Sequence, residues 1–189
     1  MHDEAEALER LPFDEDDQVW GRFEAAFEFR PDIAEFPAIT EPDPSVTWSL
    51  AVFDDDDRTR RDRGLDRLVG LVEHALTACT PPGGSVLVMD WCHPTYRLRP
   101  HLPPTELFRP YSWTDRLSRW PRSPYPNGDY FVLIAEDFSR GSFGHPQERS
   151  LCLFGADLLG MIADDVEAVL GEPIRRNGRW VSATAPEPL

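Results

Sequence analysis

The sequence predicts a single α+β domain with a mixed, mainly antiparallel central sheet of about five strands, packed by about three helices. Its length of 189 residues fits one domain of ordinary size. Hydrophobic residues make up 41% of the chain, and six Trp and eleven Phe supply large rings for a core. Segments of helical and alternating periodicity are interleaved along the chain, which is typical of a mixed fold.

The chain divides into three parts by composition. We expect a flexible acidic N-terminus at 1–13, a globular domain at 14–182 and a frayed tail at 183–189. The N-terminal residues lack the basic-then-apolar order of a secretory signal, and no run approaches the ~18 apolar residues of a membrane span. The three cysteines are far apart and form no C-x-x-C pair, so we expect reduced thiols in a cytoplasmic protein without a membrane partner.

The first half predicts helix, strand, helix and strand. A helix over 14–29 puts three rings on one face: Trp20, Phe23 and Phe27. A half-buried strand at 45–53 follows, and then a long helix that ends at 79. The four aspartates at 54–57 lack the EF-hand pattern of calcium ligands and suit the N-terminus of that helix. The RTRRDR run at 58–63 is typical of a solvated helix face, and we expect His74, opposite the apolar stripe, to be exposed to solvent. A strand at 85–91 completes one crossover with parallel strands.

Residues 92–128 predict an ordered wrap over the sheet. They hold eight prolines and six aromatic rings, and a linker would not expose so many rings. Within them, 95–99 fits a short strand and 114–119 a helical turn. The predicted wrap carries these rings: Tyr96, Phe108, Tyr111, Trp113, Trp120 and Tyr125.

The last third predicts a strand at 128–138, a turn-rich connection at 139–148 and a second strand at 149–155, antiparallel to the first. An amphipathic helix follows at 156–170, and Asn177-Gly178 fits a two-residue hairpin turn. The predicted core is Trp20, Phe23, Phe27, Trp48, Leu50, Leu68, Val72, Val88, Phe131, Leu133, Leu153, Leu158 and Ile162.

The connection at 137–148 is the strongest candidate site. His145 and Glu148 are three residues apart, and Asp137 ends the strand that enters the connection. These groups suit a general acid–base pair or half of a metal site. The alternative is structural: the glycines supply turns, and His145 fixes a wide hairpin by hydrogen bonds to the backbone.

The segment DWCHPTYR at 90–97 adds His93 and Arg97 to the candidate binding residues. His93 reaches His145 only if two strand ends lie together. Cys92 and His93 are adjacent on an extended chain and point apart, so we expect Cys92 to be a small buried residue. No G-x-S-x-G, G-x-G-x-x-G or P-loop pattern occurs, and we assign no catalytic residue, metal or cofactor.

Three stretches resemble one bacterial family. They are PYPNGDYFVLIAEDFSRGSFGHPQERSLCLFG at 124–155, the W-x-x-F-x-x-x-F pattern at 20–27 and EPDPSVTW at 41–48. Together they resemble the family catalogued as domain of unknown function 2716, over roughly residues 14–172. The family has Trp where this chain has Gln147, after the His-Pro. The resemblance implies no activity, cofactor or catalytic residue.

Net charge favours a binding function. The formal net charge is −15, and all 19 basic residues are arginine. A chain so acidic is a poor binder of nucleic acid or anionic membrane but attracts basic proteins. We therefore expect a non-enzymatic acidic interaction module with a basic protein partner, the profile of immunity proteins that cover a basic toxin nuclease. The alternative is a small hydrolase-like or ligand-binding enzyme around His145, Glu148 and Asp137, which requires these groups to converge in a pocket.

Overall fold

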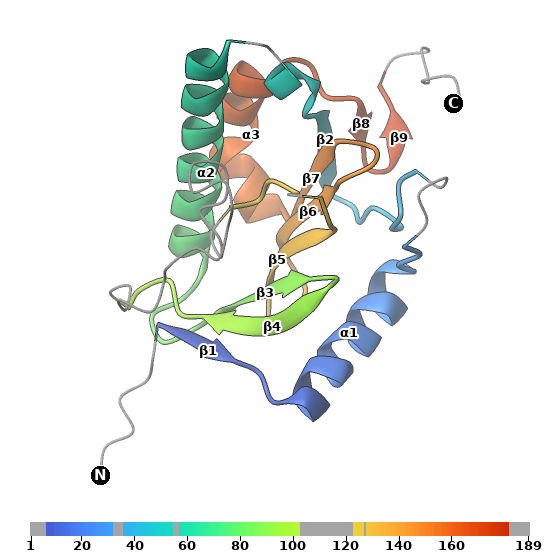
Figure 1. Ribbon diagram of the computed structural model, residues 1–189, viewed down its shortest axis with the longest axis vertical. Coiled ribbons are helices and arrows are strands. Elements are labelled where there is room, and N and C mark those ends of the chain that lie inside the picture. The colour runs from blue at the N-terminus through green and yellow to red at the C-terminus, as the bar shows by residue number, and fades with distance from the viewer. Residues whose placement is uncertain (1–6, 32–35, 55–56, 103–122, 127, 182–189) are drawn as a thin grey trace.

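A sheet with helices on both faces forms the framework of the protein (Figure 1). The computed structural model describes residues 7–31, 36–54, 57–102, 123–126 and 128–181. In these residues the sheet has nine strands in the order β1-β4-β3-β5-β6-β7-β2-β8-β9, and every neighbouring pair is antiparallel. The α+β class and the three helices are confirmed. The predictions of about five strands and of a mixed sheet are wrong.

The elements have the following bounds. The helices are α1 (Phe13–Phe27), α2 (Arg58–Cys79) and α3 (Ala156–Leu170), with a 3₁₀ turn at Ala51–Asp54. The strands are β1 (Leu8–Arg10), β2 (Ser45–Ser49), β3 (Val86–Asp90), β4 (His93–Leu98), β5 (Phe131–Ala135), β6 (Gly141–His145), β7 (Ser150–Phe154), β8 (Arg175–Arg176) and β9 (Arg179–Trp180).

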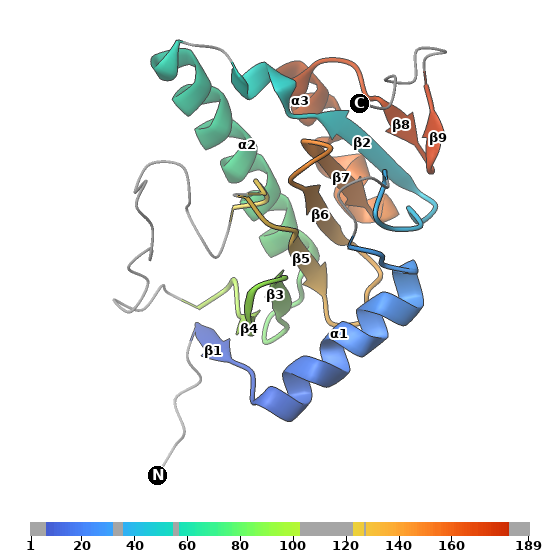
Figure 2. The ribbon, with the colours of Figure 1, turned by 45° about the vertical axis from the view of Figure 1, so that its right-hand side comes forward.

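The two faces of the sheet bury two separate cores. Side chains alternate along each strand, so Val86 and Val88 face α2 and α3 while Leu87 and Met89 face α1. Figures 1 and 2 show α1 crossing one face and the helix pair α2 and α3 covering the other. Of the predicted core residues only Trp20 is half-buried, and it packs against the core beneath α1; the others are buried.

Strand β6 occupies the segment that the sequence predicts as a turn-rich connection. Gly141 and Gly144 suggest turns, but both lie inside the sheet, at positions where neighbouring atoms leave no room for a side chain. A Cβ at Gly141 would lie 2.3 Å from the carbonyl oxygen of Leu133, and one at Gly144 would lie 3.0 Å from that of Pro124. Strand β6 therefore lies between β5 and β7 and is antiparallel to both, so β5 and β7 run in the same direction and the predicted antiparallel arrangement of these two strands is wrong.

Other differences arise from local geometry. Strand β2 ends at Ser49, and the 3₁₀ turn that follows leaves Val52 exposed. Strands β2 and β3 run in the same direction, but β7, β6 and β5 lie between them, so no parallel pair forms. Residues 8–10 fall in the segment expected to be flexible, yet they pair with β4 because the chain on either side is buried at Ala7 and Leu11.

Several predictions of local structure are confirmed. Strand β4 includes residues 95–98 of the short strand expected at 95–99, and Asn177 and Gly178 both have positive φ in the turn between β8 and β9. Asp57 caps α2 by accepting from the backbone N–H groups of Thr59 and Arg60. His74 is exposed. The helical turn at 114–119, most of the aromatic wrap and the tail at 183–189 lie outside the described residues.

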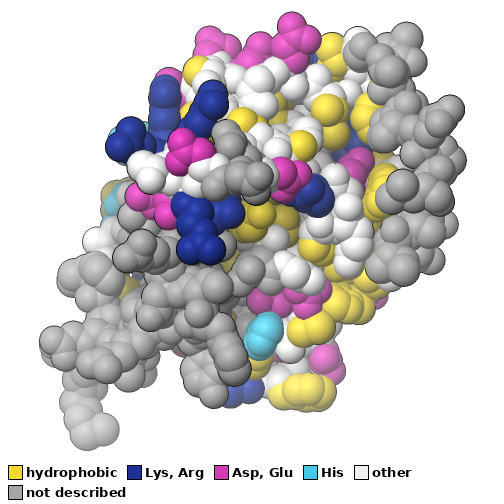
Figure 3. Space-filling model, turned by 45° about the horizontal axis from the view of Figure 1, so that its top comes forward, with side chains coloured by type: hydrophobic (Ala, Val, Ile, Leu, Met, Phe, Trp, Pro, Cys, Tyr) yellow, Lys and Arg dark blue, Asp and Glu magenta, His cyan; other side chains and the backbone are white. Residues whose placement is uncertain are grey.

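The charged surface of α2 mixes both signs. Arg58, Arg60 and Arg63 are exposed, and Asp62 lies among them with an oxygen 3.7 Å from Arg61 Nε. Figure 3 shows arginine side chains gathered on one side of this face with acidic side chains between them. Interleaved charges of this kind suit a solvated helix face better than a nucleic-acid stripe. No helix in the described part of the chain is long and apolar enough to cross a membrane.

Candidate functional site

A buried arginine between two buried glutamates is the most unusual polar feature of the described structure. We call Glu41, Glu148 and Arg175 the Arg175 cluster. Arg175 lies on β8 opposite Thr47 of β2, on the sheet face that packs against α1. Glu41 precedes β2, and Glu148 lies in the turn between β6 and β7. The side chains are almost closed to solvent, with exposed fractions of 0% for Glu41, 1% for Arg175 and 6% for Glu148.

The guanidinium is held along both edges of its plane. Its Nε donates to Glu41 Oε1 at 2.8 Å, and its two terminal nitrogens donate to the two oxygens of Glu148, with Nη2 at 2.8 Å from Oε2. Its face lies over the ring of Trp180, with Cζ 4.8 Å from the centroid. A bidentate carboxylate on one edge of a planar group that also stacks on an aromatic ring is a combination that arginine makes and a lysine ammonium does not.

The carboxylates have further donors within the sheet. Thr47 donates its hydroxyl to Glu41 Oε1 at 2.8 Å, and Ser150 donates to Glu148 Oε2 at 2.5 Å. Burial alone would lower the pKa of Arg175, but the hydrogen bonds and charges of Glu148 and Glu41 outweigh it and raise that pKa. The other oxygen of Glu41, Oε2, is buried and receives no hydrogen bond within the described residues. Two carboxylates thus face one guanidinium.

Burial of the neighbouring thiol follows the same electrostatics. Cys152 lies opposite Thr47 in the register of β7 and β2, beneath the Arg175 cluster. Burial first, and the charge of Glu41 second, raise the pKa of the Cys152 thiol. The thiol is therefore an inert buried group and not a nucleophile.

His145 ends β6 and is fully buried, with an exposed fraction of 0%. Its Nδ1 accepts the backbone N–H of Glu148 at 3.1 Å. Rings surround the imidazole, with centroids 4.9 Å away for Tyr130 and 5.2 Å for Phe36. His145 Nδ1 contacts the backbone N–H of Glu148 and not its carboxylate, which pairs with Arg175, and this hydrogen bond fixes the turn between β6 and β7.

Asp137 lies apart from His145. It belongs to the turn between β5 and β6, at the opposite end of β6, and a five-residue strand separates the two ends by about 13 Å. Its carboxylate accepts from the hydroxyl of Ser139 at 2.7 Å and from the backbone N–H of Ser139 at 3.0 Å. These hydrogen bonds lower the pKa of Asp137. The structure therefore does not assemble Asp137, His145 and Glu148 into one group.

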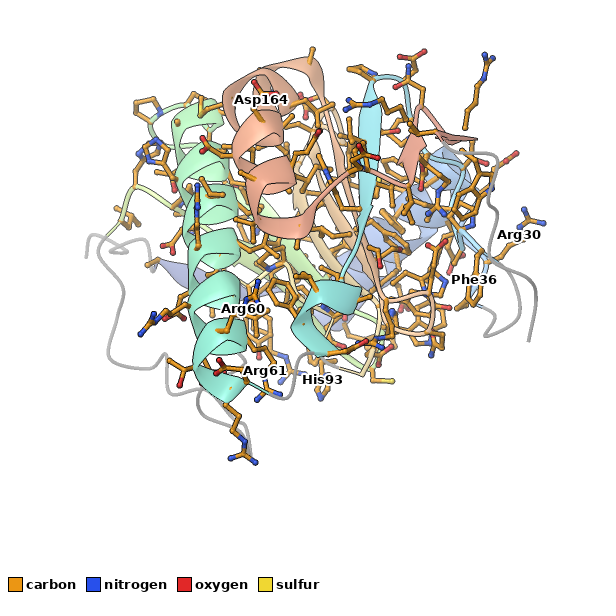
Figure 4. The ribbon with its side chains drawn as sticks, turned by 90° about the horizontal axis from the view of Figure 1, so that it is seen from above. Arg30, Phe36, Arg60, Arg61, His93 and Asp164 are labelled. Carbon is orange, nitrogen blue, oxygen red and sulfur yellow. The ribbon has the colours of Figure 1, made fainter. Side chains whose placement is uncertain are left out.

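His93 and Cys92 lie at the exposed turn between β3 and β4. His93 Nδ1 is 3.1 Å from a carboxylate oxygen of Asp90, and 67% of the side chain is exposed. Figure 4 shows His93 at the margin of the molecule. This turn is at the same end of the sheet as His145, but His93 begins β4, which is three strands from β6, about 14 Å by strand spacing. Cys92 is exposed and not buried as predicted, because the turn carries it beyond the end of β3.

The Cys92 thiol is not activated. A hydrogen bond with Asp129 is the largest cause, and slight burial and the charges of Asp129 and Asp90 add to it; together they raise the pKa of Cys92. A cysteine nucleophile needs the opposite shift.

Arg97 links the first helix to the sheet. Its guanidinium donates to Glu15 of α1 at 2.5 Å and to Glu136 at 2.7 Å, and Nη1 lies 3.6 Å from Glu9 of β1. Partial burial alone would raise the pKa of Glu136, but hydrogen bonds from Ser85 and Arg97 outweigh it and lower that pKa. Arg97 therefore has a structural role, because three carboxylates at the surface compensate its charge and join α1 and β1 to the rest of the sheet.

The described residues include no group of three or more His, Cys, Asp or Glu side chains that could hold a metal ion. A small cavity lies on the opposite side of the sheet from Arg175, between α2 and strands β3, β4 and β5, and apart from Glu73 and Thr77 its walls are apolar. The buried cluster can bind a guanidinium and hold the local fold, whereas acid–base catalysis needs a substrate to reach His145 and Glu148.

Glu41 and Arg175 are absent from the candidates that the sequence predicts. One signal was available for Arg175, because the predicted hairpin turn at 177–178 places it directly across from Trp180, as observed. Its carboxylate partners are 134 and 27 residues away along the chain. Without a tertiary structure no periodicity connects residues at such separations.

Comparison with known proteins supports the resemblance. A family described as "Protein of unknown function (DUF2716)" matches residues 10–159, and the chain belongs to this family. A Bacillus subtilis (strain 168) protein, described as the uncharacterized protein YxiI, is 26% identical over 156 residues, covering 79% of this chain and 88% of that protein. No solved structure shows significant similarity. The matched range includes Glu41 and Glu148 and ends before Arg175.

Proposed function

We propose that the protein is a non-enzymatic acidic interaction module that binds a basic protein partner. The observation that carries the proposal is the distribution of its ionisable groups. His145, Glu41 and Glu148 are closed inside the fold, whereas the outer face of α1 presents carboxylates to solvent. Buried acids and bases do no chemistry on a substrate that cannot reach them, but exposed uncompensated charge attracts a partner of opposite sign.

Helix α1 supplies the surface. Asp14, Asp17 and Glu24 are exposed, and their carboxylates have no hydrogen bond or ion pair within the described residues. Phe13, in the same first turn of α1 as Asp14, is 80% exposed. Arg22 is drawn away from this face because it donates to the carbonyl oxygen of Glu136. An exposed aromatic ring beside free carboxylates suits a partner with an apolar contact point surrounded by basic groups.

A charge-neutralising variant tests the proposal. The chain and its variants would be used to capture proteins from source-cell lysate at low and high salt, and the retained protein would be identified by mass spectrometry and purified. The variant Asp14→Asn/Asp17→Asn/Glu24→Gln is expected to bind the purified partner about tenfold more weakly, since each exposed charge contributes about 0.5 kcal/mol. An affinity for the partner that changes neither with salt concentration nor with this variant contradicts the proposal.

The matched control changes net charge by the same amount elsewhere. It carries three substitutions away from α1: Asp43→Asn, Asp164→Asn and Glu172→Gln. All three carboxylates are exposed, and Figure 4 shows Asp164 on α3. The control is expected to keep nearly full affinity. If it weakens binding as much as the α1 variant does, total charge and not the face of α1 governs association.

A further inference from the structure

We infer that Glu41 and Glu148 form a guanidinium-binding site filled within the chain by Arg175, and that an arginine on an extended segment of a partner takes this place when the β8–β9 hairpin detaches. The inference rests on the proposed function in one respect, which is that the partner is a basic protein. It names the residue type that the partner contributes and the segment of this chain that it displaces.

The first support is the completeness of the guanidinium contacts. Nε meets Glu41, both terminal nitrogens meet Glu148, and Trp180 covers the face of the group. These contacts recognise a planar fork and not merely a positive charge, because a lysine ammonium cannot donate in parallel to two oxygens of one carboxylate.

The second support is a surplus of acceptors. Glu41 Oε2 is buried with no hydrogen bond from the described residues, and the cluster holds two carboxylates for one guanidinium. His145 Nδ1 accepts the backbone N–H of Glu148, so this ring nitrogen does not donate to either carboxylate. Arg175 therefore leaves the acceptor capacity of the site partly unused, and a segment with an additional donor would satisfy it more fully.

The third support is the weak attachment of the hairpin. Strands β8 and β9 have two residues each and lie at the edge of the sheet, next to the C-terminal end (Figures 1 and 2). Within 172–181 only Pro173 and Arg175 are buried, so little apolar surface holds the hairpin in place. Segments with few buried apolar contacts open locally at a lower free energy than the core does.

Detachment would expose a strand edge together with the carboxylates. The hairpin now pairs with β2 through Ile174 N–H to Thr47 O at 2.8 Å and Asn177 N–H to Ser45 O at 2.9 Å. Thr47 is directly opposite Arg175 and donates to Glu41. An antiparallel strand added to β2 in the same register would therefore place its own arginine between Glu41 and Glu148.

Chemical rescue tests the guanidinium site in the full-length chain. The variant Arg175→Ala leaves the two carboxylates without their cation, so millimolar guanidinium is expected to raise its melting temperature by about 3 °C or more, and equal concentrations of ammonium to raise it far less. The matched control is Arg176→Ala, which removes an exposed neighbour paired with Glu167. An Arg175→Ala response to guanidinium no larger than that of Arg176→Ala overturns the assignment.

A peptide tests replacement in trans. The probe is a synthetic peptide of residues 172–181, and its matched control has citrulline, a neutral isostere, at the position of Arg175. We expect Arg175→Ala protein to bind the arginine peptide at least tenfold more tightly than the citrulline peptide. The wild-type protein should bind the arginine peptide more weakly than the variant, because its own hairpin competes. Equal affinities for the two peptides overturn the inference.

Hydrogen exchange on the wild-type chain keeps the test independent of any variant. The backbone amides of 174–181 are expected to exchange through a local opening of the β8–β9 hairpin, while the amides of β7 stay protected. Equal protection of the hairpin and of β7 would overturn the inference that a partner segment displaces the hairpin. If no partner is captured from lysate but guanidinium rescue and arginine-peptide binding succeed, the proposed function is contradicted and the guanidinium site is supported. If a basic partner is captured but the protein shows no preference for the arginine peptide, the guanidinium site is contradicted and the proposed function is supported.

Discussion

Removal of the Arg175 guanidinium is expected to destabilise the fold by about 3–5 kcal/mol, the usual cost of leaving buried charges without their partner. The substitution Arg175→Ala deletes three charge-assisted hydrogen bonds and leaves two carboxylates, Glu41 and Glu148, inside the protein. For a chain of this length each kcal/mol corresponds to about 2–4 °C, so the melting temperature should fall by about 6–20 °C.

Urea unfolding followed by tryptophan fluorescence measures the effect, because Trp48 is fully buried and changes its environment on unfolding. A second variant separates lost charge from lost packing. The triple substitution Arg175→Ala/Glu41→Gln/Glu148→Gln removes both orphaned carboxylates and should be more stable than Arg175→Ala alone by about 2 kcal/mol or more. A loss below about 1 kcal/mol for Arg175→Ala, or a triple variant no more stable than the single one, would refute the reasoning.

Three further predictions concern other parts of the fold. Gly21→Ala should stabilise the protein by about 0.5–1 kcal/mol in urea unfolding, since the added Cβ meets nothing within 4 Å, whereas Gly64→Ala should destabilise it, since its Cβ would lie 2.9 Å from a ring carbon. The pKa of Glu136 is lower in the folded protein than its ordinary value of 4.5, so the ionised carboxylate stabilises the fold above pH 4.5 and this stabilisation is lost as the pH falls through the folded pKa. Glu136→Gln should therefore flatten the acid limb of a plot of the free energy of unfolding against pH. His145→Ala should cost about 1–3 kcal/mol, because the backbone N–H that its Nδ1 accepts is left partly buried without that partner, and thermal melting measures the loss.

Each of these predictions has a definite contrary result. Gly21→Ala and Gly64→Ala share the same helical propensity term, so equal effects would mean that the ring contact at Gly64 does not matter. An acid limb unchanged by Glu136→Gln would mean that Arg97 does not hold that carboxylate in solution. An unchanged melting temperature for His145→Ala would remove the histidine from the structural role that its buried contacts indicate.

The local elements follow from the sequence because their causes are local. Helices α2 and α3 and the turn at 177–178 are marked by apolar spacing, a capping aspartate and an Asn-Gly pair, all within a few residues. Strand β6 escapes the same reasoning. Its glycines look like turn residues, and only the neighbouring carbonyl of Leu133, brought close by the sheet, explains why Gly141 has no side chain.

The candidate site divides along the same line. His145 and Glu148 are three residues apart, so the sequence by itself determined that they belong to one turn, and charge composition determined that the protein is strongly acidic. Only the tertiary structure decided that Asp137 lies at the far end of β6 and that Arg175 is buried between Glu41 and Glu148. The reason is physical: local patterns specify backbone conformation, whereas the pairing of buried charges depends on which distant strands become neighbours in the sheet.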